Sequence, residues 1–122
     1  MSEGKAGVGR IIRATGYSIN GIKACWQHEA AFRQEVALFV VLFPVSFFVA
    51  QSVVQWILLI SPLFLILMLE VINSAIESVV DRIGSEHHEL SGRAKDMSSA
   101  SVMFCLILMT LIWGAIVWDN FA

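Results

Sequence analysis

Two long stretches without a charged residue constrain this chain more than any other feature. Residues 36–69 and residues 97–118 contain no Asp, Glu, Lys or Arg. A helix that spans a bilayer needs about 20 mostly apolar residues, so the second stretch supplies one span and the first is long enough for most of two. A soluble chain of 122 residues that is 57% hydrophobic could not bury this much apolar surface. We therefore predict an all-α membrane protein with three transmembrane helices, over residues 31–50, 54–83 and 95–120.

Local sequence signals set the predicted boundaries. The polar residues within 50–52 predict a turn between the first two spans. Gly84 is typical of a residue just past a helix, where glycine adopts a left-handed conformation, so the second span should end there. A cytoplasmic loop over 84–94 should then lead to the third span. Pro44 and Pro62 lie inside spans, where prolines are tolerated as kinks.

The basic residues predict the orientation in the membrane. All eight lie in the N-terminal part of the chain or around the connection between the second and third spans: Lys5, Arg10, Arg13, Lys23, Arg33, Arg82, Arg93 and Lys95. The turn between the first two spans and the C-terminus contain none. Because Lys and Arg flank the cytoplasmic ends of spans, the N-terminus should be cytoplasmic and the C-terminus outside. No cluster of basic and aromatic residues suited to nucleic acid occurs.

The sequence contains no linker that would divide it, so residues 1–122 form a single domain that begins with a cytoplasmic or interfacial segment, 1–28. Apolar residues recur in this segment at a spacing of seven: Ile12, Ile19 and Trp26. Such a pattern, with basic residues on other faces, predicts an amphipathic helix on the membrane surface. Gly16 and the small polar residues after it predict a break in this helix.

An acidic face on the second span is the strongest signal for chemistry. Glu70, Asn73, Glu77 and Asp81 follow one another at spacings of three, four and four, which places them on one side of a helix. Carboxylates inside a membrane are costly and usually mark a functional site. Glu70 lies deepest in the span, whereas Asp81 fits a solvated helix end equally well. Burying this face is also a reason to expect an oligomer.

Two further carboxylates, those of Glu29 and Glu35, border the first span. Glu29 lies four residues before Arg33, a spacing that favours an ion pair on a helix surface. Alternatively, Glu29 joins Glu77 in holding a hard cation such as Mg²⁺, which binds one or two carboxylates together with substrate phosphates.

The connection between the second and third spans is rich in polar groups. His87 and His88 raise the possibility of a zinc site, but the connection contains no cysteine and adjacent histidines are unlike known zinc motifs. Arg93 and Lys95 either face the phosphates of a nucleotide or anchor the spans on the positive side. The chain contains no G-x-x-x-x-G-K-[ST] loop and no protein-kinase signature, so any phosphoryl transfer must use another scaffold.

Three sequence blocks resemble the prokaryotic diacylglycerol kinase family. They are EAAFRQE at 29–35, EVINSAIESVVD at 70–81 and EHHELSGRAKD at 86–96. The resemblance extends over nearly the whole chain. It implies a homotrimeric bundle in the bacterial inner membrane, in which each chain has three transmembrane helices and an N-terminal surface helix. It also implies active sites shared between subunits, where ATP and Mg²⁺ are used to phosphorylate the 3-hydroxyl of diacylglycerol to phosphatidic acid.

The resemblance also implies a role for each matching residue. Glu70 would be the general base, and Glu29 and Glu77 would hold the metal. The nucleotide would contact Tyr17, Asn73, His88, Glu89, Gly92, Arg93, Lys95 and Asp96, and the lipid would contact Arg10, Ser18, Glu35 and Ser99. Two alternatives stay open. One is an undecaprenol kinase of the same superfamily, and the other is a membrane accessory subunit that is not an enzyme and whose acidic face lines a pore.

Overall fold

The computed structural model describes residues 3–84 and 88–122, with side chains from residue 7 onward. This part of the chain forms four helices: α1 (Glu3–His28), α2 (Ala30–Val49), α3 (Val53–Ile83) and α4 (Glu89–Phe121). Of the described helices, α2, α3 and α4 are long and apolar enough to cross a membrane. The predicted all-helical fold, with three spans and an additional N-terminal helix, is therefore confirmed.

The start of the third span differs most from the predicted boundaries. α4 begins at Glu89 rather than at residue 95, so residues 89–94 are helical where a loop was predicted. The cause is a cap from His88, whose Nδ1 accepts a hydrogen bond from the backbone N–H of Leu90 at 3.0 Å. Histidine is not among the residues that usually signal a helix start. The predicted loop residues Glu86 and His87 lie outside the described residues.

The end of α3 lies where it was predicted, but the conformation of its cap differs. Gly84 follows Ile83 and has φ 173° and ψ 157°, which is extended backbone rather than the predicted left-handed conformation. At the other end of α3, the side chain of Ser52 caps the helix by accepting from the N–H of Gln55 at 3.1 Å. The turn predicted at residues 50–52 is present.

α1 is continuous from Glu3 to His28, so the break predicted at Gly16 is wrong. One glycine inside a helix costs only about 1 kcal/mol relative to alanine, which neighbouring residues can offset. Thr15, next to it, donates its hydroxyl hydrogen to the carbonyl of Ile11 at 2.8 Å, as a threonine inside a helix does. The apolar side chains at Ile12, Ile19 and Trp26 are exposed in the single chain, as expected of a helix that lies on lipid.

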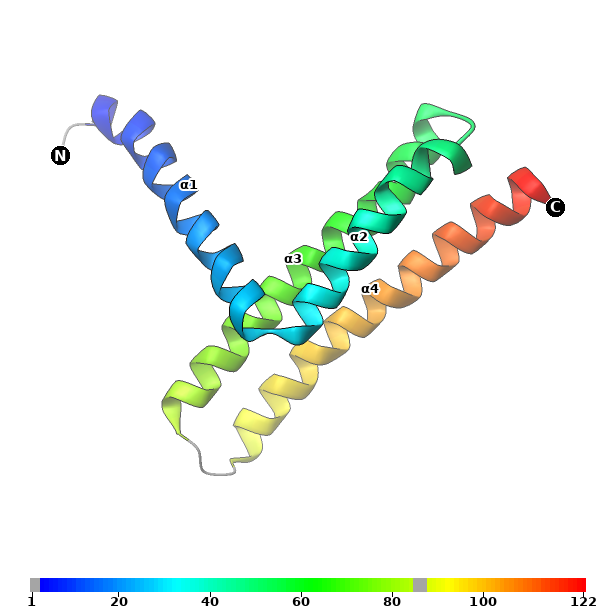
Figure 1. Cartoon of the computed structure of the whole chain (residues 1–122). Coiled ribbons are helices and arrows are strands. Elements are labelled where there is room, and N and C mark those ends of the chain that lie inside the picture. The colour runs from blue at the N-terminus through cyan, green and yellow to red at the C-terminus, as the bar shows by residue number, and fades with distance from the viewer. Residues whose placement is uncertain (1–2, 85–87) are drawn as a thin grey trace.

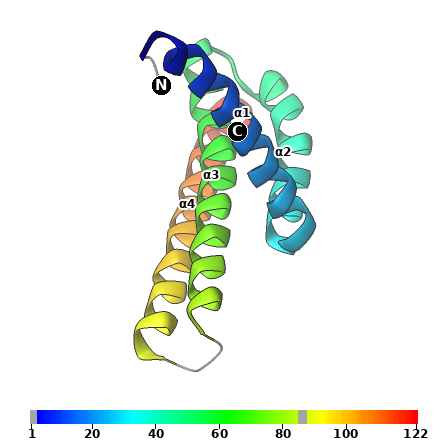
Figure 2. The ribbon, with the colours of Figure 1, turned by 90° about the vertical axis from the view of Figure 1, so that its left-hand side faces the viewer.

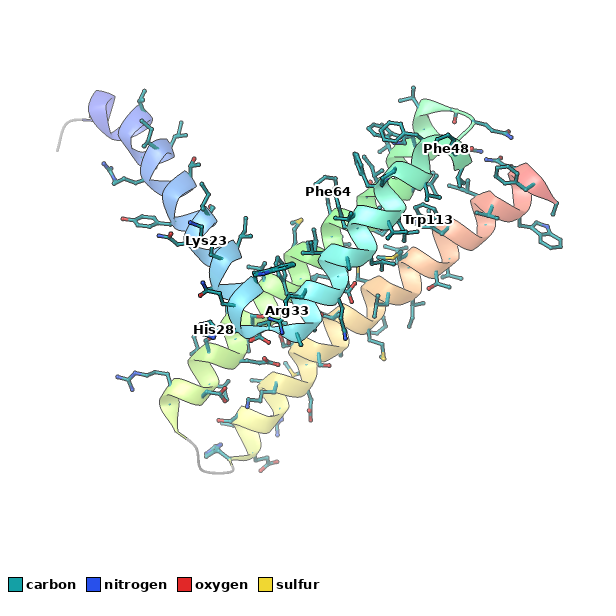
Figure 3. The ribbon with its side chains drawn as sticks, in the orientation of Figure 1. Lys23, His28, Arg33, Phe48, Phe64 and Trp113 are labelled. Carbon is teal, nitrogen blue, oxygen red and sulfur yellow. The ribbon has the colours of Figure 1, made fainter. Side chains whose placement is uncertain are left out.

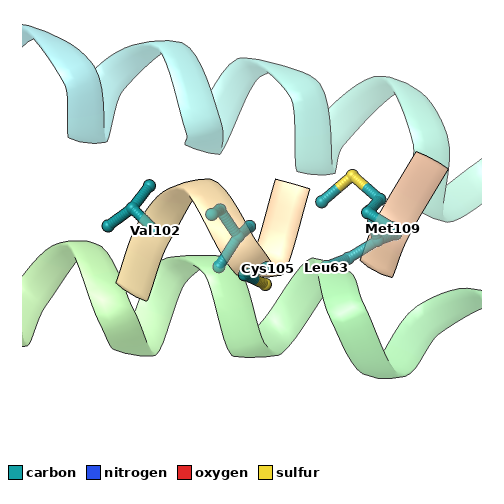
Figure 4. Close-up of a cluster of buried hydrophobic side chains, with 5 residues drawn as sticks. Leu63, Val102, Cys105 and Met109 are labelled. Atoms are coloured by element: carbon teal, nitrogen blue, oxygen red, sulfur yellow. The ribbon is translucent and has the colours of Figure 1, made fainter. Parts of the chain in front are cut away.

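The core lies between α3 and α4, with α2 packed over it. Leu63 and Ile66 of α3 meet Val102, Cys105 and Met109 of α4 (Figure 4), and Phe39 and Phe43 of α2 cover this cluster. α3 is therefore the central helix. Figures 1 and 2 show α3 and α4 running side by side for most of their length, while α1 leaves the bundle to one side. Among the described residues α1 touches α2 and α3 but not α4.

Pro44 and Pro62 both lie inside helices, as predicted. A proline has no N–H for the helix ladder and crowds the carbonyl four residues earlier, so carbonyls near it need other partners. Side chains of α4 donate to two other carbonyls close to Pro62, although neither is the carbonyl of Leu58, which lies four residues before the proline. Trp113 Nε1 donates to the carbonyl of Leu59 at 3.0 Å, and the thiol of Cys105 lies 3.7 Å from the carbonyl of Pro62. Figure 3 shows Trp113 between the helices.

A polar cluster ties the helices together at the end of the bundle that holds the α2–α3 turn. Asn120 Nδ2 donates to the carbonyl of Val49 and to Gln55 Oε1, both at 2.8 Å. Gln55 Oε1 also accepts from the backbone N–H of Gln51 at 2.9 Å. The last turn of α4 is thereby fixed to the turn between α2 and α3.

Candidate functional site

The opposite end of the bundle consists of α3 and α4 alone, because both helices extend beyond the start of α2 (Figure 1). α3 has 31 residues. A helix of this length is about 47 Å long. The hydrocarbon core of a bilayer is only about 30 Å thick, so roughly a third of α3 lies at headgroup depth or in water. Asn73, Glu77 and Asp81 lie in the last third of α3, and Glu70 lies just before it.

Burial decreases along the acidic face toward the end of α3. Glu70 is only 5% exposed, Asn73 and Glu77 are half-buried, and the side chain of Asp81 is 67% exposed. The charges of Glu29, Glu35 and Glu77 all act on the Glu70 carboxylate. Four carboxylates, from the α1–α2 junction, α2 and α3, therefore lie in the same part of the bundle.

Glu29 lies between α1 and α2, in the N-cap position of α2, where its side chain makes no capping hydrogen bond. With His28 and Ser74 it lines a cavity of about 200 Å³ between the end of α1 and α3. Figure 3 shows His28 at this junction. Glu29 is not paired with Arg33, because Arg33 Nη1 donates instead to the carbonyl of Trp26 at 2.6 Å. Glu29 therefore lines the cavity and does not form the predicted surface pair with Arg33.

Two buried oxygen atoms near these carboxylates have no hydrogen-bond partner among the described residues. They are Glu35 Oε2 and Ser74 Oγ. Ser74 is 6% exposed and lines the same cavity as Glu29. Buried polar atoms are normally satisfied, so unpaired ones mark a place where another group belongs.

α4 is joined to the acidic face by two polar contacts one turn apart. The ammonium of Lys95 lies 2.8 Å from Asp81 Oδ1. Ser98 Oγ donates to Asn73 Oδ1 at 2.7 Å, and Asn73 Nδ2 in turn donates to Glu77 Oε1 at 3.4 Å. The structure therefore places Lys95 and Ser98 of α4 against Asp81 and Asn73 of α3, with Asn73 bonded to Glu77.

The other nucleotide contacts implied by resemblance lie on the first turns of α4. His88 caps the helix, Gly92 and Asp96 follow at spacings of four, and Arg93 Nη2 pairs with Glu89 Oε1 at 3.3 Å. The side chains of Arg93 and Glu89 are 58% and 84% exposed, so this pair contributes little stability and either group is free to move. A Cβ added at Gly92 would meet no atom within 4 Å, so this surface is open.

Several predicted residues are not brought to this site by their own chain. Arg10, Tyr17 and Ser18 lie on the exposed part of α1 that projects away from the other helices (Figure 1). Ser99 is exposed, whereas its neighbour Ser98 faces α3 and is 6% exposed. A single chain therefore assembles the carboxylates with Lys95, but not the residues of α1.

Magnesium fits the donor set here, provided that a phosphate shares it. No three or more His, Cys, Asp or Glu side chains in the described part of the chain lie close enough together to hold a metal ion. Mg²⁺ needs only one or two carboxylates when phosphate oxygens and waters complete its shell. Glu77, oriented by Asn73, and Glu29, facing the cavity, are hard oxygen donors of the required kind.

Sequence reasoning missed Ser98 and gave Asp81 no partner. The signal for Ser98 was its register with the buried α4 residues Val102 and Cys105, at spacings of four and seven, which identify the face of α4 that packs on α3. Lys95 lies three residues earlier on the same face. Reading that register would have selected Ser98 as the residue beside Asn73, whereas Ser99, which was expected to contact the lipid, is exposed.

Comparison with known proteins gives consistent matches over almost the full length. Residues 16–117 match the family model described as prokaryotic diacylglycerol kinase. The chain is 46% identical over 121 residues to the diacylglycerol kinase of Escherichia coli K12, an alignment that covers 99% of both chains. It is also 46% identical to the diacylglycerol kinase of Haemophilus influenzae, over 92% of this chain and 95% of that one. The Pseudomonas aeruginosa diacylglycerol kinase is likewise 46% identical, over 93% of each.

Proposed function

The chain belongs to the prokaryotic diacylglycerol kinase family, and on that premise we propose that it transfers the γ-phosphoryl group of ATP to the 3-hydroxyl of diacylglycerol. The products are phosphatidic acid and ADP. The observation that supports the proposal most is the burial of Glu70 on α3, in the same part of the bundle as other carboxylates. Further along α3, Asp81 forms an ion pair with Lys95 of α4.

Glu70 is the group proposed to accept the proton of the lipid hydroxyl. The O–H bond breaks as the 3-oxygen forms a bond with the γ-phosphorus, and the bond from that phosphorus to the bridging oxygen of ADP breaks. A base for this step must wait at headgroup depth, because diacylglycerol stays in the membrane. Glu70 lies on a spanning helix, just before the last third of α3, and is 5% exposed, which supports this role.

Glu29 and Glu77 are the residues proposed to hold Mg²⁺, and Asn73 keeps the Glu77 carboxylate in place. When bound, Mg²⁺ neutralises negative charge on the phosphate oxygens. Lys95 supplies a second positive charge from α4. The first turns of α4 are proposed to contact the nucleotide through His88, Glu89, Gly92, Arg93 and Asp96. The N-terminus of a helix favours anions, which supports placing the phosphates there.

The lipid is proposed to lie against α1, α2 and α3. An open apolar groove of about 720 Å³ runs between these helices, and Trp26, Phe32 and Met68 are among its lining residues. This groove is suited to an acyl chain and supports a lipid substrate. Arg10, Ser18, Glu35 and Ser99 are the proposed contacts of the lipid headgroup region.

We further propose a homotrimer with shared active sites in the bacterial inner membrane, with the N-terminus cytoplasmic and the C-terminus outside. α1 projects from its own chain's bundle (Figure 1), and Arg10 and Tyr17 on it are exposed, which supports their contact with a neighbouring subunit. The basic residues at the α3–α4 connection support a cytoplasmic location for that end.

Undecaprenol kinase activity is the alternative substrate assignment, because it would use the same motifs with a different lipid alcohol. The names of the relatives at 46% identity favour diacylglycerol. A membrane accessory subunit without enzymatic activity is not consistent with membership of a kinase family.

The test is to incubate the purified protein in mixed micelles with ATP, Mg²⁺ and either diacylglycerol or undecaprenol. We expect phosphatidic acid from the first mixture and little product from the second. The reverse preference would establish the alternative substrate, and no lipid product with either would contradict the proposal. Glu70→Gln protein serves as the matched blank, because it removes only the proposed base.

A further inference from the structure

A chain of hydrogen bonds crosses from α4 to the proposed metal ligand on α3. Ser98 Oγ donates to Asn73 Oδ1 at 2.7 Å, and Asn73 Nδ2 donates to Glu77 Oε1 at 3.4 Å. Ser98 is 6% exposed, so its hydroxyl has little access to water. The first bond joins two helices across 25 positions of sequence, whereas the second lies within α3.

The chemistry of the three groups fixes the direction of these bonds. An ionised carboxylate can only accept, so Asn73 must present its NH₂ group to Glu77. The amide oxygen of Asn73 must then face α4, where it requires a donor. A serine hydroxyl can donate, and Ser98 is positioned to do so. The orientation of the Asn73 amide therefore depends on a hydroxyl at position 98.

We propose that Ser98 is a positioning residue that acts through Asn73 to orient Glu77 for Mg²⁺, and so sets the affinity for the Mg²⁺–nucleotide complex. The inference rests on the proposed function and deepens it, by naming a residue outside the expected contact set. Ser98 touches neither substrate nor metal. Its contribution is to stop the Asn73 amide from rotating, so that Glu77 Oε1 keeps its donor.

Removing the hydroxyl leaves the Asn73 amide oxygen without a donor at a half-buried position. The amide can then rotate, and Glu77 loses the bond that holds its carboxylate. Changes to groups that orient a metal ligand typically weaken metal affinity about 10- to 100-fold. Because the bond from Asn73 to Glu77 is long, we expect Ser98→Ala to lie at the lower end, about tenfold.

Ser101 provides a matched control on the same helix. Its hydroxyl donates to the carbonyl of Ser98 at 2.6 Å, within α4, and it is half-buried. Ser101→Ala makes the same chemical change one turn away, but leaves the bond between Ser98 and Asn73 in place. Ser98→Thr is the conservative variant, because it retains a hydroxyl that can donate.

The experiment measures the Kd of a non-hydrolysable ATP analogue by calorimetry, with and without Mg²⁺, for the wild-type protein and these three variants. Ser98→Ala should weaken binding about tenfold with Mg²⁺ and leave binding without Mg²⁺ unchanged. Ser98→Thr should restore most of the loss, and Ser101→Ala should match the wild type. The inference would be overturned if Ser98→Ala weakened binding of the analogue equally with and without Mg²⁺. It would also be overturned if Ser98→Ala and Ser101→Ala changed the Kd equally, or if neither changed it.

Lipid phosphorylation by the same samples separates this inference from the proposed function. The inference predicts a raised KM for Mg²⁺–ATP in Ser98→Ala protein, with kcat within about twofold of wild type, because only binding through Glu77 is changed. Binding that depends on Ser98 in a protein that phosphorylates no lipid would contradict the proposed function and support the inference. Normal phosphorylation with an unchanged KM in Ser98→Ala protein would contradict the inference alone.

Discussion

Lys95 on α4 and Asp81 on α3 form an ion pair with 2.8 Å between the ammonium nitrogen and Oδ1. The two side chains are 43% and 67% exposed. An ion pair with this much access to water contributes little to stability. Asp81 therefore holds Lys95 near Glu77 only weakly, and a nucleotide phosphate carrying more charge can replace Asp81 as the partner of Lys95.

Changing Asp81 to Asn should therefore have a small effect, and it should favour the nucleotide. The substitution removes a competitor for Lys95 and a negative charge near the proposed phosphate site. We expect the KM for ATP to fall by up to about fivefold, the equivalent of about 1 kcal/mol. Steady-state kinetics at saturating lipid measure this. Lys95→Met protein is the comparison, and its KM should rise instead. A large rise in KM for Asp81→Asn protein would show that Asp81 itself contributes to binding.

Changing Glu70 to Gln should abolish turnover without disturbing the fold. The two side chains have the same shape, but an amide cannot accept the hydroxyl proton. General-base catalysis is worth about 10²–10⁴ in rate, so kcat should fall by at least a hundredfold. The assay is phosphatidic acid formation, with binding of the Mg²⁺–ATP analogue measured in parallel and expected to stay near the wild-type value. Asp119→Asn, an exposed carboxylate change near the other end of α4, should have no effect. Near-normal turnover in Glu70→Gln protein would exclude Glu70 as the base.

Changing Glu77 to Gln should raise the requirement for Mg²⁺. The amide keeps one oxygen but loses the charge that favours a divalent ion, and its NH₂ group would face the NH₂ group of Asn73 if the side chain kept its place. We expect the concentration of Mg²⁺ at half-maximal rate to increase at least tenfold, as for other changes that disturb a metal ligand. The measurement is a Mg²⁺ titration at constant lipid and ATP. An unchanged titration curve would remove Glu77 from the metal site.

The spans could be predicted from sequence because their signal is local. Charge-free stretches identified the spans, and the predicted bounds, helped by the turn at 50–52 and by Gly84, lie within one residue of those of α2 and α3. The helix starts and breaks that depend on single side chains were less predictable. The cap from His88 lets α4 begin at Glu89, earlier than predicted. α1 continues through Gly16, where a break was predicted.

Part of the candidate site could also be predicted, because the spacing of residues along one helix is a local signal. A spacing of three and four placed Glu70, Asn73 and Glu77 on one face of α3 without reference to other helices. The contacts from α4 depend on which face of that helix meets α3, and this is set by the packing of Val102 and Cys105. Sequence spacing within α3 contains no information about that register, so the bond from Ser98 to Asn73 became evident only in three dimensions.

Changing Asn120 to Ala should destabilise the bundle at the end remote from the site. The substitution removes hydrogen bonds to the carbonyl of Val49 and to Gln55. Hydrogen bonds between membrane helices contribute about 0.6 kcal/mol each on average and up to about 2. We expect the free energy of unfolding in mixed micelles to fall by about 1–2 kcal/mol. The measurement is the circular dichroism of the protein as the denaturant concentration is raised. Asp119→Ala, one residue earlier and exposed, is the control and should change little. Reduced kcat with unchanged stability in Asn120→Ala protein would contradict a purely structural role.

Subunit mixing tests whether α1 completes the site of a neighbouring chain. Tyr17 is exposed on the part of α1 that projects from the bundle, and among the described residues α1 does not touch α4 of its own chain. Tyr17 is proposed to contact a nucleotide whose other proposed contacts lie mostly at the start of α4, with Asn73 on α3. If Tyr17 and the α4 residues contact the same nucleotide, the site combines α1 of one subunit with α3 and α4 of another.

Two inactive or impaired proteins should therefore restore each other's activity. If the proposed trimer shares its sites in this way, mixed trimers of Tyr17→Ala and Glu70→Gln chains contain sites that pair the intact α1 of a Glu70→Gln chain with the intact Glu70 of a Tyr17→Ala chain. The two proteins should be unfolded together and refolded as a mixture, and phosphatidic acid formation compared with that of each protein refolded alone. The control is a mixture of Glu70→Gln and Lys95→Met chains. Glu70 and Lys95 are proposed to act in the same site from α3 and α4 of one chain, so this mixture should not regain activity. Recovery in the first mixture and not in the second would establish sharing through α1, whereas no recovery in the first would place Tyr17 in the site of its own chain.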